Sequence, residues 1–105
     1  MRKYRIIVTP DAEEDLRRYL LYLKNVRKNP QAVRNVLKDF RATKISLSNN
    51  AGSLKEPESE ELVRRGLRRI NFISHNYFLL FYVIDNAAYI TQIFHASENF
   101  EEKLR

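Results

Sequence analysis

The residues best suited to chemistry in this chain are arginines that lie close together in its second half. They are Arg64, Arg65, Arg68 and Arg69. A planar guanidinium group donates two hydrogen bonds at once, which suits it to phosphate oxygens. Set on a strand, these arginines could bind a nucleic acid or another target. Alternatively, they pair with Glu60, Glu61 or carboxylates near the C-terminus, and the sequence leaves both interpretations open.

Two histidines and a tyrosine are further candidates. His75 lies in a polar turn just before Tyr77, and His95 ends an apolar run. Imidazole titrates near neutral pH, so either histidine could be a general acid or base, and Tyr77 could stack on a base or donate a proton. A structural role is the competing interpretation for all three. No nucleophile pattern surrounds them and no residue stands at metal-ligand spacing, so we expect neither a metal nor a cofactor.

The composition narrows the class of protein. The chain has 105 residues, which predicts a single domain over residues 1–105, and it contains no cysteine. Its net charge of +6 favours a polyanion or an acidic protein as partner. No apolar run reaches the roughly 20 residues that span a bilayer, and residues 1–5 lack the apolar stretch of a signal peptide. We therefore expect a cytoplasmic protein with no membrane partner.

The elements that must position these residues follow from local patterns. Thr9-Pro10 and Asn29-Pro30 are helix-start signals, because each pairs a capping side chain with a proline suited to the first turn. They predict two helices, ending near Lys28 and Leu47, that form an antiparallel hairpin. We expect strands over residues 4–9, 64–73, 77–85 and 89–95, and a loop over residues 48–61.

The predicted fold is α+β, in the order β-α-α-β-β-β. The antiparallel helical hairpin packs on one face of a small, mainly antiparallel twisted sheet, and the opposite face is partly open. Residues 77–84 are apolar on both faces, so they should form the central strand of the last three. The first strand should join beside one of the later strands, and Gly66 should form a bulge.

The order of these elements and the local sequence resemble a known superfamily. The matching pieces are residues 4–16, 67–70, 76–85 and 89–95, which together extend over nearly the whole chain. The chain resembles the RelE/ParE superfamily of type II toxin–antitoxin toxins. This resemblance implies a growth-inhibiting toxin that is neutralised by a cognate antitoxin. It also implies one of two activities: RelE-like members cleave mRNA on the ribosome, and ParE-like members poison DNA gyrase.

The catalytic residues of RelE-like ribonucleases match this sequence poorly. Arg69 matches a basic position on the second strand, but Phe78 stands where RelE-like enzymes place an arginine. Residues 96–105 lack the expected basic residues and terminal tyrosine, and their glutamates would repel a phosphate backbone. A ribonuclease would have to use a rearranged catalytic set of Arg68, Arg69, His75 and His95.

We therefore expect a ParE-like toxin that contacts DNA gyrase without catalysis of its own. The alternative is a ribosome-dependent mRNA endoribonuclease, so the sequence leaves open whether the protein is an enzyme. A third hypothesis is a member that has lost toxicity and keeps antitoxin and operator binding.

Overall fold

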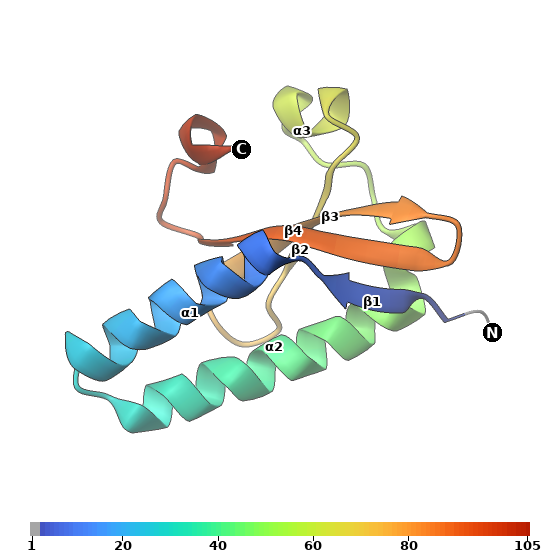
Figure 1. Cartoon of the computed structure of the whole chain (residues 1–105). Coiled ribbons are helices and arrows are strands. Elements are labelled where there is room, and N and C mark those ends of the chain that lie inside the picture. The colour runs from blue at the N-terminus through green and yellow to red at the C-terminus, as the bar shows by residue number, and fades with distance from the viewer. Residues whose placement is uncertain (1–2) are drawn as a thin grey trace.

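The computed structural model describes residues 3–105 and places two long helices beneath a small sheet (Figure 1). The elements, in chain order, are β1 (Arg5–Val8), α1 (Pro10–Asn25), α2 (Pro30–Asn50), the 3-10 turn η1 (Ala51–Ser53), α3 (Glu60–Arg64), β2 (Arg68–Asn71), β3 (Tyr77–Ile84), β4 (Ala87–His95) and the 3-10 turn η2 (Phe100–Lys103). Among residues 3–105, no helix combines the length and apolar character needed to cross a membrane.

Both predicted helix starts are confirmed. The side chain of Thr9 accepts a hydrogen bond from the backbone N–H of Ala12, and that of Asn29 accepts one from Ala32. α1 ends at Asn25, three residues before the predicted Lys28, and Lys28 itself adopts a left-handed conformation with φ of 53°. This sharp reversal sends α2 back along α1 as an antiparallel partner.

The prediction that a loop begins at Ser48 was wrong, because α2 continues to Asn50. Tertiary contacts explain the extra turn. The Ser48 hydroxyl donates to the carbonyl of Tyr4 at 2.7 Å, and the Tyr4 N–H donates to the carbonyl of Ser48 at 2.9 Å. The chain just before β1 therefore holds the end of α2 in place.

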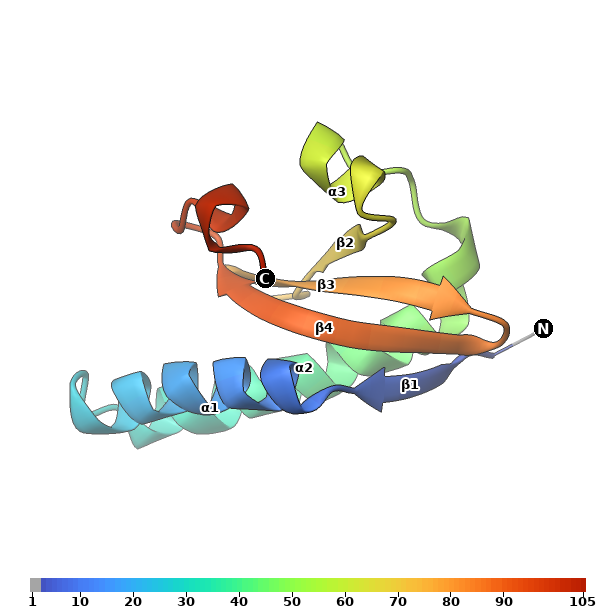
Figure 2. The ribbon, with the colours of Figure 1, turned by 45° about the horizontal axis from the view of Figure 1, so that its top comes forward.

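The sheet has the strand order β1-β4-β3-β2. β3 lies between β2 and β4 and is antiparallel to both, which confirms it as the central strand of the three (Figure 2). β1 joins beside a later strand, as predicted; that strand is β4, and β1 runs parallel to it. The bulge lies not at Gly66 but at Thr91 of β4, which has no partner because the consecutive residues Leu80 and Phe81 pair with Gln92 and Ile90. Gly66 instead has φ of +71° and follows α3, where its missing Cβ permits the left-handed turn that ends the helix. The segment 64–67, predicted as strand, therefore belongs to α3 and its end.

Each face of the sheet carries a core. The helix-side core lies against α1 and α2; its buried members are Ala12, Val36, Phe40, Leu47, Ala51, Phe72, Tyr77, Leu79, Phe81, Ala88, Ile90 and Ile93. The second core consists of Leu62, Phe78, Leu80 and Phe94, with Leu67, Phe100 and Leu104 packed against it. The expectation of a partly open second face is confirmed. α3 and the C-terminal segment (residues 96–105) cover this cluster, but Ile84, further along the same face of β3, is 53% exposed, and Tyr82 and Tyr89 are only half-buried.

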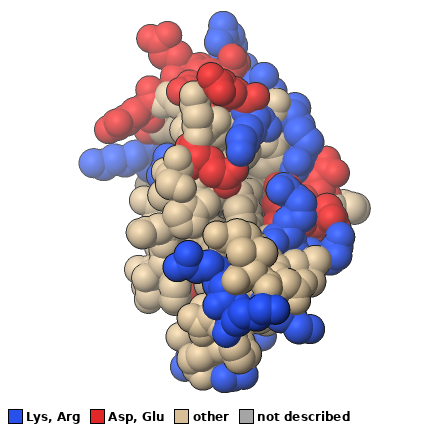
Figure 3. All heavy atoms as spheres, turned by 90° about the vertical axis from the view of Figure 1, so that its left-hand side faces the viewer, with Lys and Arg blue, Asp and Glu red and all other residues tan. Residues whose placement is uncertain are grey.

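The charged side chains are unevenly distributed over the surface. Figure 3 shows Lys and Arg along the right-hand side of the view and over its lower end, where the tip of the helical hairpin lies and almost no carboxylate is seen. Carboxylates gather mainly in the upper part of the same view, over α3 and the C-terminal segment. The two ends of the molecule therefore offer different electrostatic environments to a partner.

Candidate functional site

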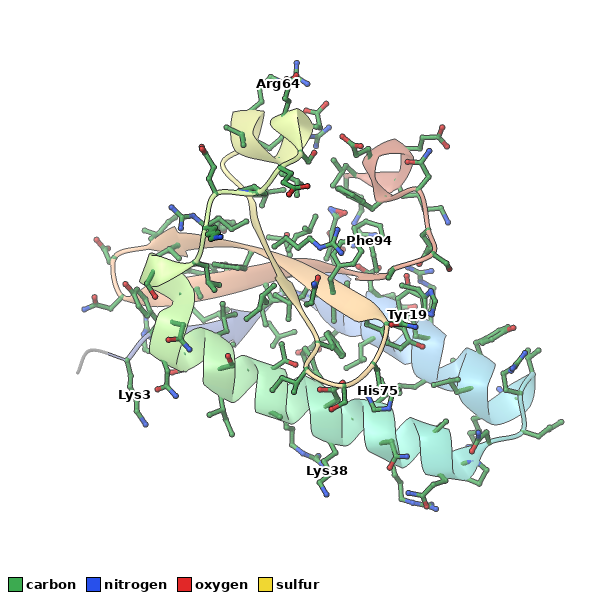
Figure 4. All side chains as sticks on the ribbon, turned by 180° about the vertical axis from the view of Figure 1, so that it is seen from behind. Lys3, Tyr19, Lys38, Arg64, His75 and Phe94 are labelled. Carbon is green, nitrogen blue, oxygen red and sulfur yellow. The ribbon has the colours of Figure 1, made fainter. Side chains whose placement is uncertain are left out.

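The predicted row of four arginines is divided in the structure. Arg64 and Arg65 lie at the end of α3 and form salt bridges with Glu61, at 3.0 and 3.2 Å. Arg65 also donates to the backbone carbonyl of Arg105 at 2.9 Å. Figure 4 shows Arg64 at the tip of α3, pointing away from the sheet. For this pair the alternative of internal pairing is confirmed.

Arg68 and Arg69 lie on β2 and point to opposite faces of the sheet. Arg68 is opposite Phe81 of the helix-side core, and its Nη1 donates to the carbonyl of Leu54 at 2.8 Å. The guanidinium of Arg69 lies 3.7 Å above the centre of the Phe78 ring in the second core. Burial lowers the pKa of Arg69 from its ordinary value, although the charge of Glu58 acts in the opposite direction. A strand that alternates its side chains cannot aim both guanidinium groups at one phosphate.

His75 has a structural position. Its Nδ1 lies 2.7 Å from Oδ2 of Asp39, a carboxylate on α2 that is only 6% exposed. The same carboxylate accepts the backbone N–H groups of Ile73 and Ser74, each at 3.0 Å. Figure 4 shows His75 in the β2–β3 turn above α2. Asp39 therefore fastens this turn to the helical hairpin, and His75 is one of its contacts.

A groove between α1 and the ends of β3 and β4 is the candidate functional site. Its volume is about 590 Å³, and its lining consists of Arg18, Tyr19, Tyr22, Leu23, Arg27, Tyr77, His95, Ser97 and Glu98. Aromatic rings form its wall and two arginines belong to its lining. Tyr22 is half exposed, so its ring is accessible to a partner.

Three rings pack in series along the wall of the groove. The rings of Tyr19 and Tyr77 meet edge to face with 5.2 Å between centroids, and Tyr77 and His95 do so at 5.0 Å. β3 and β4 bring the last two together, because Tyr77 and His95 are directly opposite in the sheet. The Nδ1 of His95 also lies 2.7 Å from the hydroxyl of Ser97. These contacts fix the rings before any partner arrives.

Glu98 is the charged anchor of this wall. Its Oε1 accepts hydrogen bonds from the Tyr19 hydroxyl and the His95 backbone N–H, and its Oε2 pairs with Lys103 at 2.8 Å. Burial alone would raise the pKa of Glu98, but these bonds outweigh it and lower the pKa to about 2. Burial raises the pKa of Tyr19 well above its ordinary value, as does its bond to Glu98, and burial also raises the pKa of Tyr77. At neutral pH the Glu98 carboxylate is therefore ionised, and the phenols of Tyr19 and Tyr77 are protonated.

A second buried carboxylate aligns α1 with the sheet. Oδ2 of Asp15, which is 2% exposed, accepts the backbone N–H of Ile93 at 3.0 Å and the guanidinium of Arg105 at 2.8 Å. Its Oδ1 pairs with Arg18 at 2.7 Å. The bond to Ile93 sets α1 beside β4, so Tyr19, one turn later on α1, meets the end of that strand.

Of the residues singled out in the sequence, only Tyr77 and His95 meet in this groove. Sequence reasoning missed Arg18, Tyr19, Tyr22, Arg27 and Glu98. The available signal for Tyr19 and Tyr22 was their spacing of three residues in the predicted first helix, which makes them neighbours on its surface. Nothing local indicated that α1 would lie against the ends of β3 and β4.

Comparison with known proteins identifies the class. The model of the ParE toxin of the type II toxin–antitoxin system parDE matches residues 6–100. The structure is similar to the chromosomal ParDE toxin–antitoxin system from P. aeruginosa, with TM-score 0.71 and 18% identity over 90% of this chain and 98% of that chain. It is also similar to the toxin–antitoxin complex RelBE2 from Mycobacterium tuberculosis, with TM-score 0.60 and 20% identity over 93% and 97% of the two chains. No curated protein sequence matches the chain.

The fold is therefore that of the RelE/ParE superfamily of toxins, as the sequence indicated. Because the family model extends over most of the chain, the protein belongs to the ParE toxin family. It is the toxin component of a type II toxin–antitoxin system, and its partner is an antitoxin.

Proposed function

We propose that this toxin inhibits growth by binding DNA gyrase through protein–protein contact, without catalysis of its own. The observation that carries the proposal is the dispersal of the ribonuclease candidates. Arg68 and Arg69 face opposite sides of the sheet, and His75 is bound to Asp39. Arg68 pairs with Phe81 and His95 with Tyr77, which puts them four residues apart along β3, or roughly 13 Å. Metal-free RNA cleavage needs such groups around one phosphate.

The chemistry of the groove also favours protein binding over RNA cleavage. Ionised Glu98 would repel a phosphate, and the protonated phenols of Tyr19 and Tyr77 are poor bases. Tyrosine and arginine are, however, the residues most enriched at energetically important points of protein interfaces. Tyr22 and Arg27 are both exposed in the lining. The groove suits a protein segment that inserts an apolar side chain beside Tyr22 and places a carboxylate near Arg27.

The test is a pair of reactions with the purified toxin. Gyrase with supercoiled plasmid should accumulate gyrase–DNA breaks, and ribosomes translating an mRNA should leave that mRNA intact. Cuts within translated codons, mapped by primer extension, would overturn the proposal in favour of the endoribonuclease. If neither effect occurs while the antitoxin still binds, the chain is a member that has lost toxicity.

Variants sharpen this test. Replacing Tyr22 by Ala should weaken gyrase binding at least tenfold, since removal of such an anchor at an interface removes about 2 kcal/mol or more. Tyr82→Ala is the matched control, because this half-buried tyrosine on β3 stacks on Tyr89 outside the groove. The double variant Arg68→Ala, Arg69→Ala should remain toxic if it folds, which thermal unfolding can check. Action on gyrase would also place the protein in the cytoplasm.

A further inference from the structure

The strongest unused feature of the molecule is the charge of the helical hairpin. Seven cations lie between residues 24 and 44, at Lys24, Arg27, Lys28, Arg34, Lys38, Arg41 and Lys44. The same segment has one carboxylate, Asp39, which is buried and committed to the β2–β3 turn. With seven cations and one carboxylate, residues 24–44 have a net charge of +6, which equals that of the whole chain.

These seven cations have no carboxylate partner in the part of the chain that the structure describes, unlike six of the cations elsewhere. Within residues 3–105, no salt bridge includes any of the seven, whereas Arg17, Arg64 and Lys103 are paired with glutamates. Arg34 donates only to the neutral side chain of Gln31, and Lys44 lies over the ring of Phe40. Their charge is therefore available to a partner.

The centre of this surface is a straight row on α2. Arg34, Lys38 and Arg41 are all exposed, and their spacing of four and three residues places them on one face of the helix. With a rise of 1.5 Å per residue, the row is about 10.5 Å long. Figure 4 shows Lys38 pointing away from the sheet, so the row faces away from the groove and from both cores.

We propose that this row, the α2 basic face (Arg34, Lys38 and Arg41), binds the phosphate backbone of duplex DNA. A DNA duplex carries about six charges over 10 Å, which matches a compact row of cations. A protein segment would need an apolar anchor, since aromatic side chains are enriched at the centres of protein interfaces. The α2 basic face has no aromatic member, and Ile45 is the exposed apolar residue beyond its end.

The choice of DNA over other polyanions rests on the proposed function, because gyrase works while bound to DNA. In that setting the α2 basic face would contact the DNA while the groove contacts the enzyme. The contact is independent of base sequence, since phosphate oxygens carry no sequence information.

The test measures binding of a fluorescently labelled 20-bp duplex by anisotropy, without gyrase, from 50 to 200 mM salt. The variant Arg34→Gln, Lys38→Gln, Arg41→Gln removes three exposed cations. The matched control Arg17→Gln, Arg64→Gln, Lys103→Gln removes three that are salt-bridged, so both reach the same net charge. Circular dichroism establishes that both fold.

We expect the α2 variant to lose at least about tenfold in affinity and the control to stay within about twofold. The slope of log K against log salt should become less steep by about 2.7 in the α2 variant, at roughly 0.9 per lost phosphate contact. Equal losses in the two variants would show a general charge effect and overturn the proposal. Displacement by polyglutamate as effective as by unlabelled DNA, or more effective displacement by an RNA hairpin, would overturn the assignment to DNA. Because no gyrase is present, failure here leaves the proposed function standing.

Discussion

The two faces of the sheet are covered in different ways. The helix-side core lies under α1 and α2, which have 16 and 21 residues. The second core lies under α3 and η2, which have 5 and 4 residues. Leu79 and Leu80 are adjacent, fully buried, and face one core each. Two equally buried side chains can therefore contribute differently to stability. When one is truncated, short covering segments can move into the cavity that remains, whereas long packed helices cannot.

The largest expected effect follows from truncation on the helix side. Leu79→Ala should lower the free energy of unfolding by about 3–5 kcal/mol, because α1 and α2 cannot move into the cavity that remains. Urea denaturation followed by circular dichroism measures it. A loss below about 2 kcal/mol would mean that the hairpin is more adaptable than its packing indicates.

Leu80→Ala provides the matched comparison on the second face. We expect a smaller loss, about 2–3 kcal/mol, because α3 and the C-terminal segment can partly fill the space. Hydrogen exchange should become faster in residues 96–105 and stay slow in α1 and α2. If Leu80→Ala were as destabilising as Leu79→Ala, the proposed difference between the covers would be wrong.

Glu98 fixes the beginning of the segment that covers the second core, and its effect depends on pH. Its pKa is about 2 in the folded protein against an ordinary 4.5, so its stabilisation is full above pH 4.5 and disappears as pH falls towards 2. Glu98→Gln should lower the free energy of unfolding by about 1–2 kcal/mol at pH 7, allowing for partial exposure of the carboxylate.

Thermal unfolding from pH 7 to pH 2.5 checks this, and the curves of wild type and variant should converge at low pH. Glu102→Gln is the control, since this glutamate is exposed and has no salt bridge within residues 3–105. A difference between wild type and Glu98→Gln that stayed constant with pH would rule out the carboxylate charge as its origin.

The smallest expected effect concerns Arg105, which links the C-terminal segment to buried Asp15. Arg105→Gln should lower the free energy of unfolding by about 0.5–1 kcal/mol. The effect is small because the Arg105 side chain is 46% exposed, and because Asp15 retains its salt bridge to Arg18 and its hydrogen bond from the Ile93 N–H. Limited proteolysis should cleave the C-terminal segment faster. Arg18→Gln removes another partner of Asp15 and should leave that cleavage rate unchanged.

Local signals predicted much of the fold. Thr9-Pro10 and Asn29-Pro30 marked both long helices, since a helix start depends on residues within one turn of it. The apolar run at residues 77–84 correctly marked the central strand of the meander. The sequence also contained a signal for α3 that was misinterpreted: Ser59 caps this helix and Gly66 ends it, whereas Gly66 was assigned to a bulge.

The site was less predictable, because its parts meet only through tertiary contacts. The pairing of Tyr77 with His95 depends on the register of β3 and β4. The approach of Tyr19 depends on the bond from the Ile93 N–H to Asp15, 78 residues away along the chain. The arginines on β2 were overestimated for the same reason. Pairing with Glu61 was a visible alternative for Arg64 and Arg65, but the contacts of Arg68 with Leu54 and of Arg69 with Phe78 form only in the folded chain.

The parallel pairing of β1 with β4 has a consequence for synthesis of the protein. The backbone N–H of Arg5 in β1 donates to the carbonyl of Asn86, and that of Thr9, the residue after β1, donates to the carbonyl of Ile90. A nascent chain can form its helical hairpin early, but its first strand has no partner until the last quarter has emerged from the ribosome. We therefore expect incomplete chains to be non-toxic. An antitoxin can then be synthesised at any time before translation of the toxin ends.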